Sequence, residues 1–261
     1  MPFSKLRLMD GGVDEYRPKK ARKYMQGKQP VAPRADRWAS RADPAGTSLD
    51  MLPWSSVFSS RLEPRHQSLL WLVQHGAVPT ARVTVHFLPD ATPNCPVCGA
   101  PFETLRHYFF DCPRVCAFWQ QVGGFLDRIQ VRPPAQPAHV ELKDVLTGLP
   151  AWKEKVPSLI IFYVLAMWQI YRAHAEAALD GICIPAVAMF ARWQGEVMRR
   201  IRIDNINAAR NNRMDRFEAN WVSIRCQWFV FERGGGEPGR GRVEFDPTFA
   251  TPSHVSSSAV E

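Results

Sequence analysis

Cys95-Pro-Val-Cys98, followed by His107 and Cys112, is the stretch of sequence that decides the fold. Its spacing, C-x2-C-x8-H-x4-C, places three thiols and one imidazole close together along the chain. A closed tetrahedral zinc site takes four ligands of these two kinds. We therefore interpret Cys95, Cys98, His107 and Cys112 as the ligands of one structural Zn²⁺ ion.

The residues around the ligands favour the local conformations that such a site needs. Gly99 can adopt the left-handed backbone that ends a tight turn. Pro113 favours the first position of a helix, so we expect Cys112 at a helix N-terminus, where the helix dipole stabilises a thiolate. We predict one or two helical turns over residues 103–110 and a helix from 113 to about 129.

Other readings of the cysteines and histidines stay open. Cys116 lies one helical turn after Cys112 and is an alternative fourth ligand. Disulfides are disfavoured because the first residues lack the apolar run of a secretory signal, and disulfides form mainly in secreted proteins. Cys183 and Cys226 have no ligand spacing, and we expect them to be structural. We interpret three histidines as non-ligands: His66, His75 and His86.

This part of the sequence resembles the zinc-binding region that follows the reverse transcriptase domain of non-LTR (LINE-type) retrotransposons. The likeness covers roughly residues 54 to 120. It is carried by Trp71, Gly76 to Thr80, Cys95, Cys98, Glu103-Thr104, His107, Phe109-Phe110, Cys112-Pro113 and Trp119. The resemblance implies that the region helps to hold the element's RNA or target DNA beside the polymerase. The polymerase and endonuclease that precede this region in the family are missing from this sequence.

Composition and charge limit the classes of function. The chain has 261 residues, and its 46% hydrophobic residues, with nine Trp and fifteen Phe, are enough to bury a core. The net charge of +8 and the pI near 9.4 favour nucleic acid as partner over an acidic membrane surface. The longest apolar run, Leu159 to Trp168, is too short to span a bilayer. We therefore expect no membrane partner.

The predicted fold is mainly α, with a small structural zinc-knuckle unit, a helical C-terminal unit and a disordered basic N-terminal tail. Its expected parts are a tail over 1–48, a reverse-transcriptase-type zinc-binding domain over 49–130, a Pro-rich linker and short helix over 131–153, a helical domain over 154–232, and a flexible Gly/Arg and Ser tail over 233–261.

Helix and strand signals fill in these parts. Residues 64–75 read as a helix that stops at Gly76, and residues 78–88 alternate like a short strand or an extended segment. Residues 157–179 predict a long helix that stops at Gly181, with a first half that is apolar on every face and therefore buried on all sides. A further strand or packed segment is expected over 224–231.

The last predicted helix runs from Pro185 to about Val222, although several asparagines weaken it near residue 210. Its apolar stripe consists of Val187, Phe190, Trp193, Val197 and Ile201. At 100° per residue, Arg192, Arg199 and Arg210 fall within about 20° of one another on the opposite face, and Arg202 and Arg213 extend that face. Such a row suits the phosphates of one strand, and an ordinary solvated face is the alternative.

The N-terminal tail contains a second basic group. Lys19, Lys20, Arg22 and Lys23 form a dense run that suits a nuclear-import receptor or phosphates, so we expect an intracellular, nuclear protein. A solvated tail is again the alternative.

These patterns predict a zinc-dependent nucleic-acid-binding protein, derived from the C-terminal region of a non-LTR retrotransposon reverse transcriptase. Its expected partners are RNA or single-stranded or duplex DNA, and a reverse transcriptase encoded elsewhere. We expect no catalytic activity of its own, because no aspartate cluster for two magnesium ions is visible and four protein ligands leave zinc no open position. The alternative is a zinc-stabilised helical protein–protein interaction module.

Overall fold

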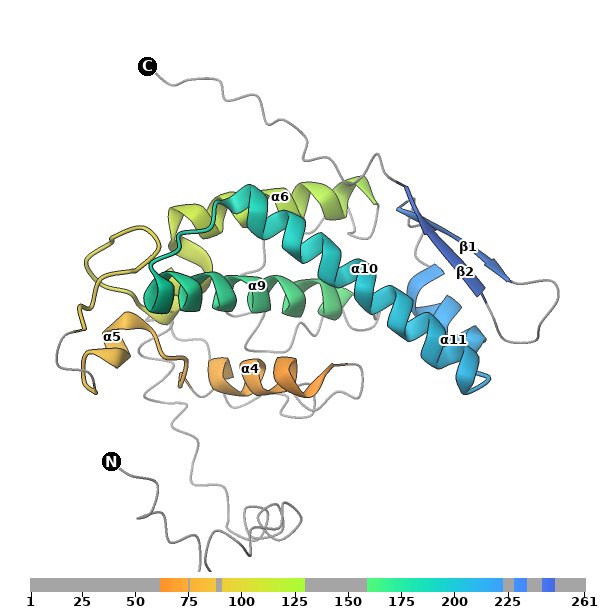
Figure 1. Ribbon diagram of the computed structural model, residues 1–261, viewed down its shortest axis with the longest axis horizontal. Coiled ribbons are helices and arrows are strands. Elements are labelled where there is room, and N and C mark those ends of the chain that lie inside the picture. Colours follow the sequence, from red (N-terminus) through yellow and green to blue (C-terminus); the bar gives the residue numbers. More distant parts are fainter. Residues whose placement is uncertain are drawn as a thin grey trace, which may run out of the picture. The chain divides into compact units, whose positions relative to one another are not determined.

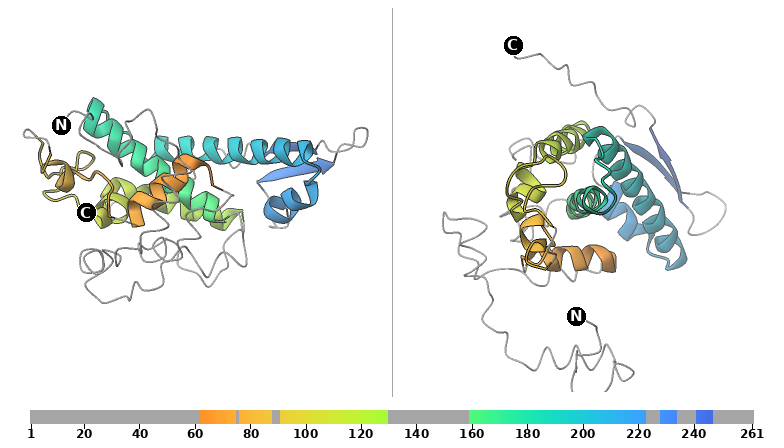
Figure 2. Two further views of the ribbon diagram at one scale, coloured as in Figure 1. Left: turned by 90° about the horizontal axis from the view of Figure 1, so that it is seen from below. Right: turned by 60° about the vertical axis from the view of Figure 1, so that its left-hand side comes forward.

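Helix α9, Leu159–Asp180, lies at the centre of the computed structural model, between α4, Pro64–Gln74, on one side and α6, Pro113–Arg128, and α10, Ala186–Arg210, on the other (Figure 1). Every side chain from Ile160 to Met167 is buried. The prediction that the first half of this helix is buried on all sides is therefore confirmed. The second view of Figure 2 shows the same helix enclosed by its neighbours.

The structure describes residues 62–74, 76–87, 91–129, 159–222, 228–233 and 241–246. All of these belong to one compact unit of the chain, Thr47–Glu261. Several predictions lie outside the described residues: the basic tail over 1–48 with Lys19, Lys20, Arg22 and Lys23, the linker and short helix over 131–153, and the placement of Cys226.

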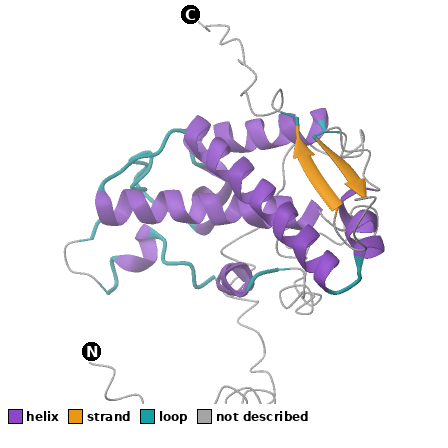
Figure 3. Ribbon diagram, turned by 45° about the vertical axis from the view of Figure 1, so that its right-hand side comes forward, coloured by secondary structure: helices purple, strands orange, loops and turns teal. Residues whose placement is uncertain are grey.

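The described residues are mostly helical, which confirms the mainly α prediction. The remaining elements are α5, Ala81–Thr84; the π-helix η3, His107–Asp111; α11, Met214–Phe217; the π-helix η4, Glu218–Val222; and two strands, β1, Phe229–Arg233, and β2, Gly241–Phe245. The strands pair antiparallel, with Phe229 opposite Phe245 and Arg233 opposite Gly241 (Figure 3). No helix in the described part of the chain has the length and apolarity to cross a membrane.

Aromatic side chains join the helices into one core. Trp193 on α10 is fully buried and donates a hydrogen bond from Nε1 to the Phe162 carbonyl of α9, at 3.0 Å. Phe125 of α6 meets the Trp193 ring edge to face at 5.4 Å and the Trp228 ring at 4.8 Å. Offset and edge-to-face pairs of this kind add to the free energy gained by burying the rings. The region around the zinc ligands and the C-terminal helices therefore share one core.

Helix ends follow the glycines as predicted. Gly76 and Gly181 have φ of 58° and 68°, in the left-handed region that ends a helix at low cost for glycine. The last long helix ends at Arg210, earlier than Val222, and Asn212 takes a φ of 52° just after it. Asparagine tolerates this conformation better than most residues, which explains the early end.

Three expectations were wrong. The described part of this segment, residues 78–87, contains the short helix α5 and no strand, and Phe87, which belonged to the alternating pattern, is 78% exposed. Val187, expected in the apolar stripe of the last helix, is 48% exposed, and Met189 is buried in the first turns of α10 instead. Gly241–Phe245, expected within the flexible tail, forms β2, because Phe245 packs on Trp228 at 5.2 Å between ring centroids.

Candidate metal centre

The turn that carries Cys95 and Cys98 is closed by backbone hydrogen bonds. The Gly99 N–H donates to the Cys95 carbonyl at 2.8 Å, and the Cys95 N–H donates to the Ala100 carbonyl at 2.8 Å. Gly99 has a φ of 76°, the left-handed conformation that the sequence predicted. The turn therefore holds both sulfurs on one side of the backbone.

The other two ligands lie at the two ends of a π-helical turn. Thr104 Oγ1 accepts the His107 N–H at 3.0 Å, and this bond fixes the start of η3. The Cys112 N–H donates to the His107 carbonyl at 2.9 Å, and Cys112 is then the N-cap of α6, followed by Pro113. The predicted position of Cys112 at a helix N-terminus is confirmed.

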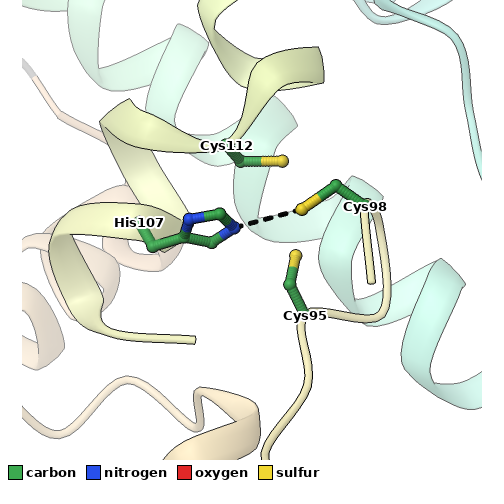
Figure 4. A group of neighbouring side chains, drawn as sticks. All are labelled: Cys95, Cys98, His107 and Cys112. Carbon is green, nitrogen blue, oxygen red and sulfur yellow. Dashed lines mark hydrogen bonds between the residues drawn. The ribbon is translucent and has the colours of Figure 1, made fainter. Parts of the chain in front are cut away.

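The four ligand side chains converge on one point (Figure 4). Their donor atoms all lie within 4.8 Å of one another, and Cys98 Sγ lies 3.2 Å from His107 Nε2. Cys95 and Cys112 are buried, whereas Cys98 is exposed. Three thiols and one imidazole are the donor set of structural zinc sites, so the residues present fit one Zn²⁺ ion. The predicted ligand set is the one that the structure brings together.

The electrostatics of the buried pair favour a thiolate on Cys112. A hydrogen bond with Cys95 is the main cause that lowers the pKa of Cys112; burial opposes it, and His174 and the backbone N–H groups of Val115 and Arg114 add to it. The same hydrogen bond, together with burial, raises the pKa of Cys95. Metal binding needs deprotonated thiols, so the Cys95–Cys112 pair releases its remaining proton when zinc binds.

The remaining described cysteines do not join the cluster. Cys116 Sγ donates to the Phe110 carbonyl at 2.9 Å, so the structure favours Cys112 over Cys116 as fourth ligand. Cys183 was expected to be structural, but it is exposed, with Sγ 3.5 Å from the Pro96 carbonyl of the turn.

Residues 41–119 match the protein family described as zinc-binding in reverse transcriptase. All four converging ligands lie within this match. Residues 41–119 are therefore similar to a zinc-binding region of the reverse transcriptase type. The resemblance inferred from the ligand spacing is thereby confirmed.

The chain is also similar to a putative ribonuclease H protein of Arabidopsis thaliana, with 24% identity over 187 residues. The match covers 61% of this chain and 30% of the relative, so the chain spans less than a third of that protein's length. No solved structure matches the chain. Together with the family match, this relative supports a retroelement-derived zinc-binding protein.

Two buried polar residues beside the zinc ligands were not predicted. Glu103 precedes η3, and His174 comes from α9, far along the chain. With Cys95 they form a second group whose potential ligand atoms lie within 4.8 Å of one another. Glu103 was part of the family-like pattern, but no spacing in the sequence connects it to His174.

The arginines predicted to bind nucleic acid fall into two groups. Arg192 binds Glu176 on α9 at 2.9 and 3.0 Å, and Arg199 binds Glu196 at 2.8 Å and Glu63 at 3.2 Å. The other three, Arg202, Arg210 and Arg213, are exposed, and Arg202 lies over the Phe245 ring at 5.2 Å.

Proposed function

We propose that this chain is a zinc-dependent nucleic-acid-binding protein, derived from the C-terminal region of a non-LTR retrotransposon reverse transcriptase and without catalytic activity of its own. The observation that carries the proposal is a set of exposed arginines in the last third of α10 and just beyond it. We call it the C-terminal arginine surface and define it as Arg202, Arg210, Arg213 and Arg216.

Unpaired guanidinium groups are what a phosphate backbone requires. Within the part of the chain that the structure describes, no carboxylate forms an ion pair with any arginine of this surface. The nearby Asp204 carboxylate is already used, since it accepts bonds from Arg200 at 2.9 Å and Trp221 at 3.1 Å. Arginine binds phosphate through a planar fork of donors, so the surface suits several phosphates of RNA or DNA.

The zinc centre supports a structural role in this function. Four protein ligands complete a tetrahedral zinc site, and a catalytic zinc needs an open position for water or substrate. We propose that the zinc region orders the core from which α10 carries the arginine surface. The proposal extends to a reverse transcriptase encoded elsewhere as partner and to a nuclear location, which the basic run Lys19 to Lys23 would serve.

Salt dependence of binding tests the proposal. Affinity for single-stranded RNA and DNA is measured between about 50 and 200 mM salt, where counterion release gives a slope near −0.7 for each phosphate contact on a single strand. We expect a slope of about −2 to −3 from the four arginines of the surface. No binding at low salt would contradict the proposal, and so would cleavage or primer extension that persists through further purification.

A protein–protein interaction module is the second candidate. Leu179 is 84% exposed, and Ile182 and Val187 are also exposed, all near the turn from α9 to α10. Cys183, in the same turn, contacts Pro96 of the zinc-ligand turn, so the two turns lie side by side. Exposed aliphatic groups in one place favour a protein partner. This candidate would be favoured if the chain bound a protein with an affinity that does not depend on salt concentration and did not bind nucleic acid.

A further inference from the structure

His174 of α9 faces the zinc ligands from the protein interior. Its Nε2 atom lies 3.9 Å from Cys95 Sγ and 3.4 Å from Glu103 Oε1. His174 also helps to lower the pKa of the Cys112 thiol. The side chains of His174 and Glu103 are only 2% and 1% exposed. His174 is therefore buried beside the zinc ligands, and its other contacts determine which ring atom faces them.

Two contacts fix the His174 ring, and a third fixes the tyrosine on which the ring stacks. The Nδ1–H donates to the Ile170 carbonyl, one turn earlier on α9, at 3.0 Å. One face stacks on Tyr108, with ring centroids 3.8 Å apart and planes at 21°. Tyr108 is held in turn, because its hydroxyl donates to the Tyr171 carbonyl at 3.2 Å. The ring therefore presents Nε2 to the sulfurs in one orientation.

Glu103 connects the surroundings of His174 Nε2 to α5 and to the segment before Cys95. Its Oε2 atom accepts the Ala81 N–H at the start of α5, at 2.6 Å, and its own N–H donates to the Pro93 carbonyl at 3.0 Å. Its Oε1 atom is buried and has no hydrogen-bond donor among the described residues. A buried carboxylate oxygen without a hydrogen bond needs an explanation. Its ion-pair contact is with His174 Nε2, at 3.4 Å, and the potential ligand atoms of Glu103, His174 and the zinc ligand Cys95 lie within 4.8 Å of one another.

We propose that His174 and Glu103 form the outer shell of the zinc centre and that α9 thereby positions the Cys95 and Cys112 thiolates for the metal. Outer-shell partners orient the ligands of metal sites and contribute strongly to affinity. Zinc affinity would then depend on a helix, Leu159–Asp180, that lies beyond the residues matching the zinc-binding family. This inference does not rest on the proposed binding of nucleic acid.

A second cation held by Cys95, Glu103 and His174 is the competing explanation of the orphaned oxygen. It is less favourable, because Cys95 already belongs to a complete set of four ligands and would have to bridge two ions. The second group would then contribute only two ligands of its own. Metal stoichiometry distinguishes the two explanations.

Paired substitutions in the full chain test the outer shell. His174→Gln keeps a polar nitrogen near the position of Nε2, whereas His174→Phe keeps the ring and its stacking on Tyr108 but removes every polar atom. We expect His174→Phe to weaken zinc binding by about 10- to 100-fold in competition with a chelator. We expect His174→Gln to restore most of this affinity. With Co²⁺ as probe, the thiolate charge-transfer band should shift in His174→Phe and return towards the original in His174→Gln.

His66→Phe is the matched control. His66 is also a buried histidine and contacts Trp168 of α9, but it does not belong to either group of potential ligands. We expect it to change stability without changing zinc affinity or the Co²⁺ spectrum. Unchanged zinc affinity in His174→Phe would overturn the proposal, as would equal losses in all three variants. Two metal ions per chain, with one lost in both His174 variants, would overturn it in favour of the second cation.

Discussion

The zinc centre and the arginines of α10 make an instructive comparison, because both were predicted from spacing along the chain. The zinc ligands converge as predicted, since all four lie within Cys95 to Cys112 and are placed by one turn and one helix start. The predicted row of arginines divides, since Arg192 is bound by Glu176 of α9 and Arg199 by Glu63, which precedes α4. Spacing predicts a site whose ligands are close together in the sequence, and it cannot reveal partners that come from distant segments.

The largest expected effect is the loss of a zinc ligand. Cys112→Ser removes one thiolate and leaves an incomplete site, and structural zinc contributes roughly 10 to 16 kcal/mol in small zinc-finger peptides, more than the net stability of most domains. We expect the variant to lose zinc and its cooperative unfolding transition. Cys116→Ser is the control and should keep both, because Cys116 bonds the Phe110 carbonyl. Equal zinc content in the two variants would show that the ligand set is wrong.

An intermediate loss of stability is expected at low pH from His66, which lies on α4 near α10. Burial is the main cause that lowers the pKa of His66 from 6.5 to about 4; Arg65 and Arg200 add to this, whereas Glu63 and Glu196 oppose it. The unfolded chain takes up the proton below its own pKa, and the folded chain takes it up only near pH 4. Stability is therefore lost as pH falls from about 6.5 to 4, by about 2 kcal/mol at pH 5.

His66→Phe isolates this contribution, because phenylalanine can keep a ring contact with Trp168 and does not titrate. The free energy of unfolding is measured for both proteins between pH 7 and 5. The difference between the two proteins should change by about 2 kcal/mol over that range, because all other groups are common to both. Parallel curves would show that His66 is not kept neutral in the folded protein.

The smallest effect on stability is expected from two double variants that remove the same charge. They compare the exposed arginines directly with the arginines that are bound by glutamates. Arg210→Gln with Arg213→Gln should leave stability unchanged and reduce the salt slope of nucleic-acid binding by about 1.4, or 0.7 for each contact. Arg192→Gln with Arg199→Gln should leave the slope unchanged and cost at most about 1 kcal/mol of stability for each half-exposed ion pair. A smaller salt slope in the Arg192/Arg199 variant, with an unchanged slope in the Arg210/Arg213 variant, would show that the predicted row of arginines is the binding surface after all.

The parts of the fold that the sequence predicted share one property: their cause is local. Pro113 begins α6, Gly181 follows α9, and the continuous apolar run of α9 is enclosed on all sides. The elements that the sequence did not predict depend on residues far away in the chain. The Ala81 N–H at the start of α5 donates a hydrogen bond to Glu103, and β2 forms because Phe245 packs against Trp228 and Phe229 of the paired segment.

The same distinction holds within the metal centre. Its four ligands could be identified from spacing, whereas His174 could not, because α9 reaches the site only through tertiary packing. The division of the arginines also needed the structure, since Arg199 meets Glu63 from a segment that precedes α4.

Metal content of the purified full chain tests the central claim most directly. Four converging ligands predict one zinc ion per chain, and its removal by a chelator should abolish much of the helical circular dichroism, because the ligands support η3 and the start of α6. Less than half an equivalent of zinc, or a circular dichroism spectrum unchanged by the chelator, would contradict the claim.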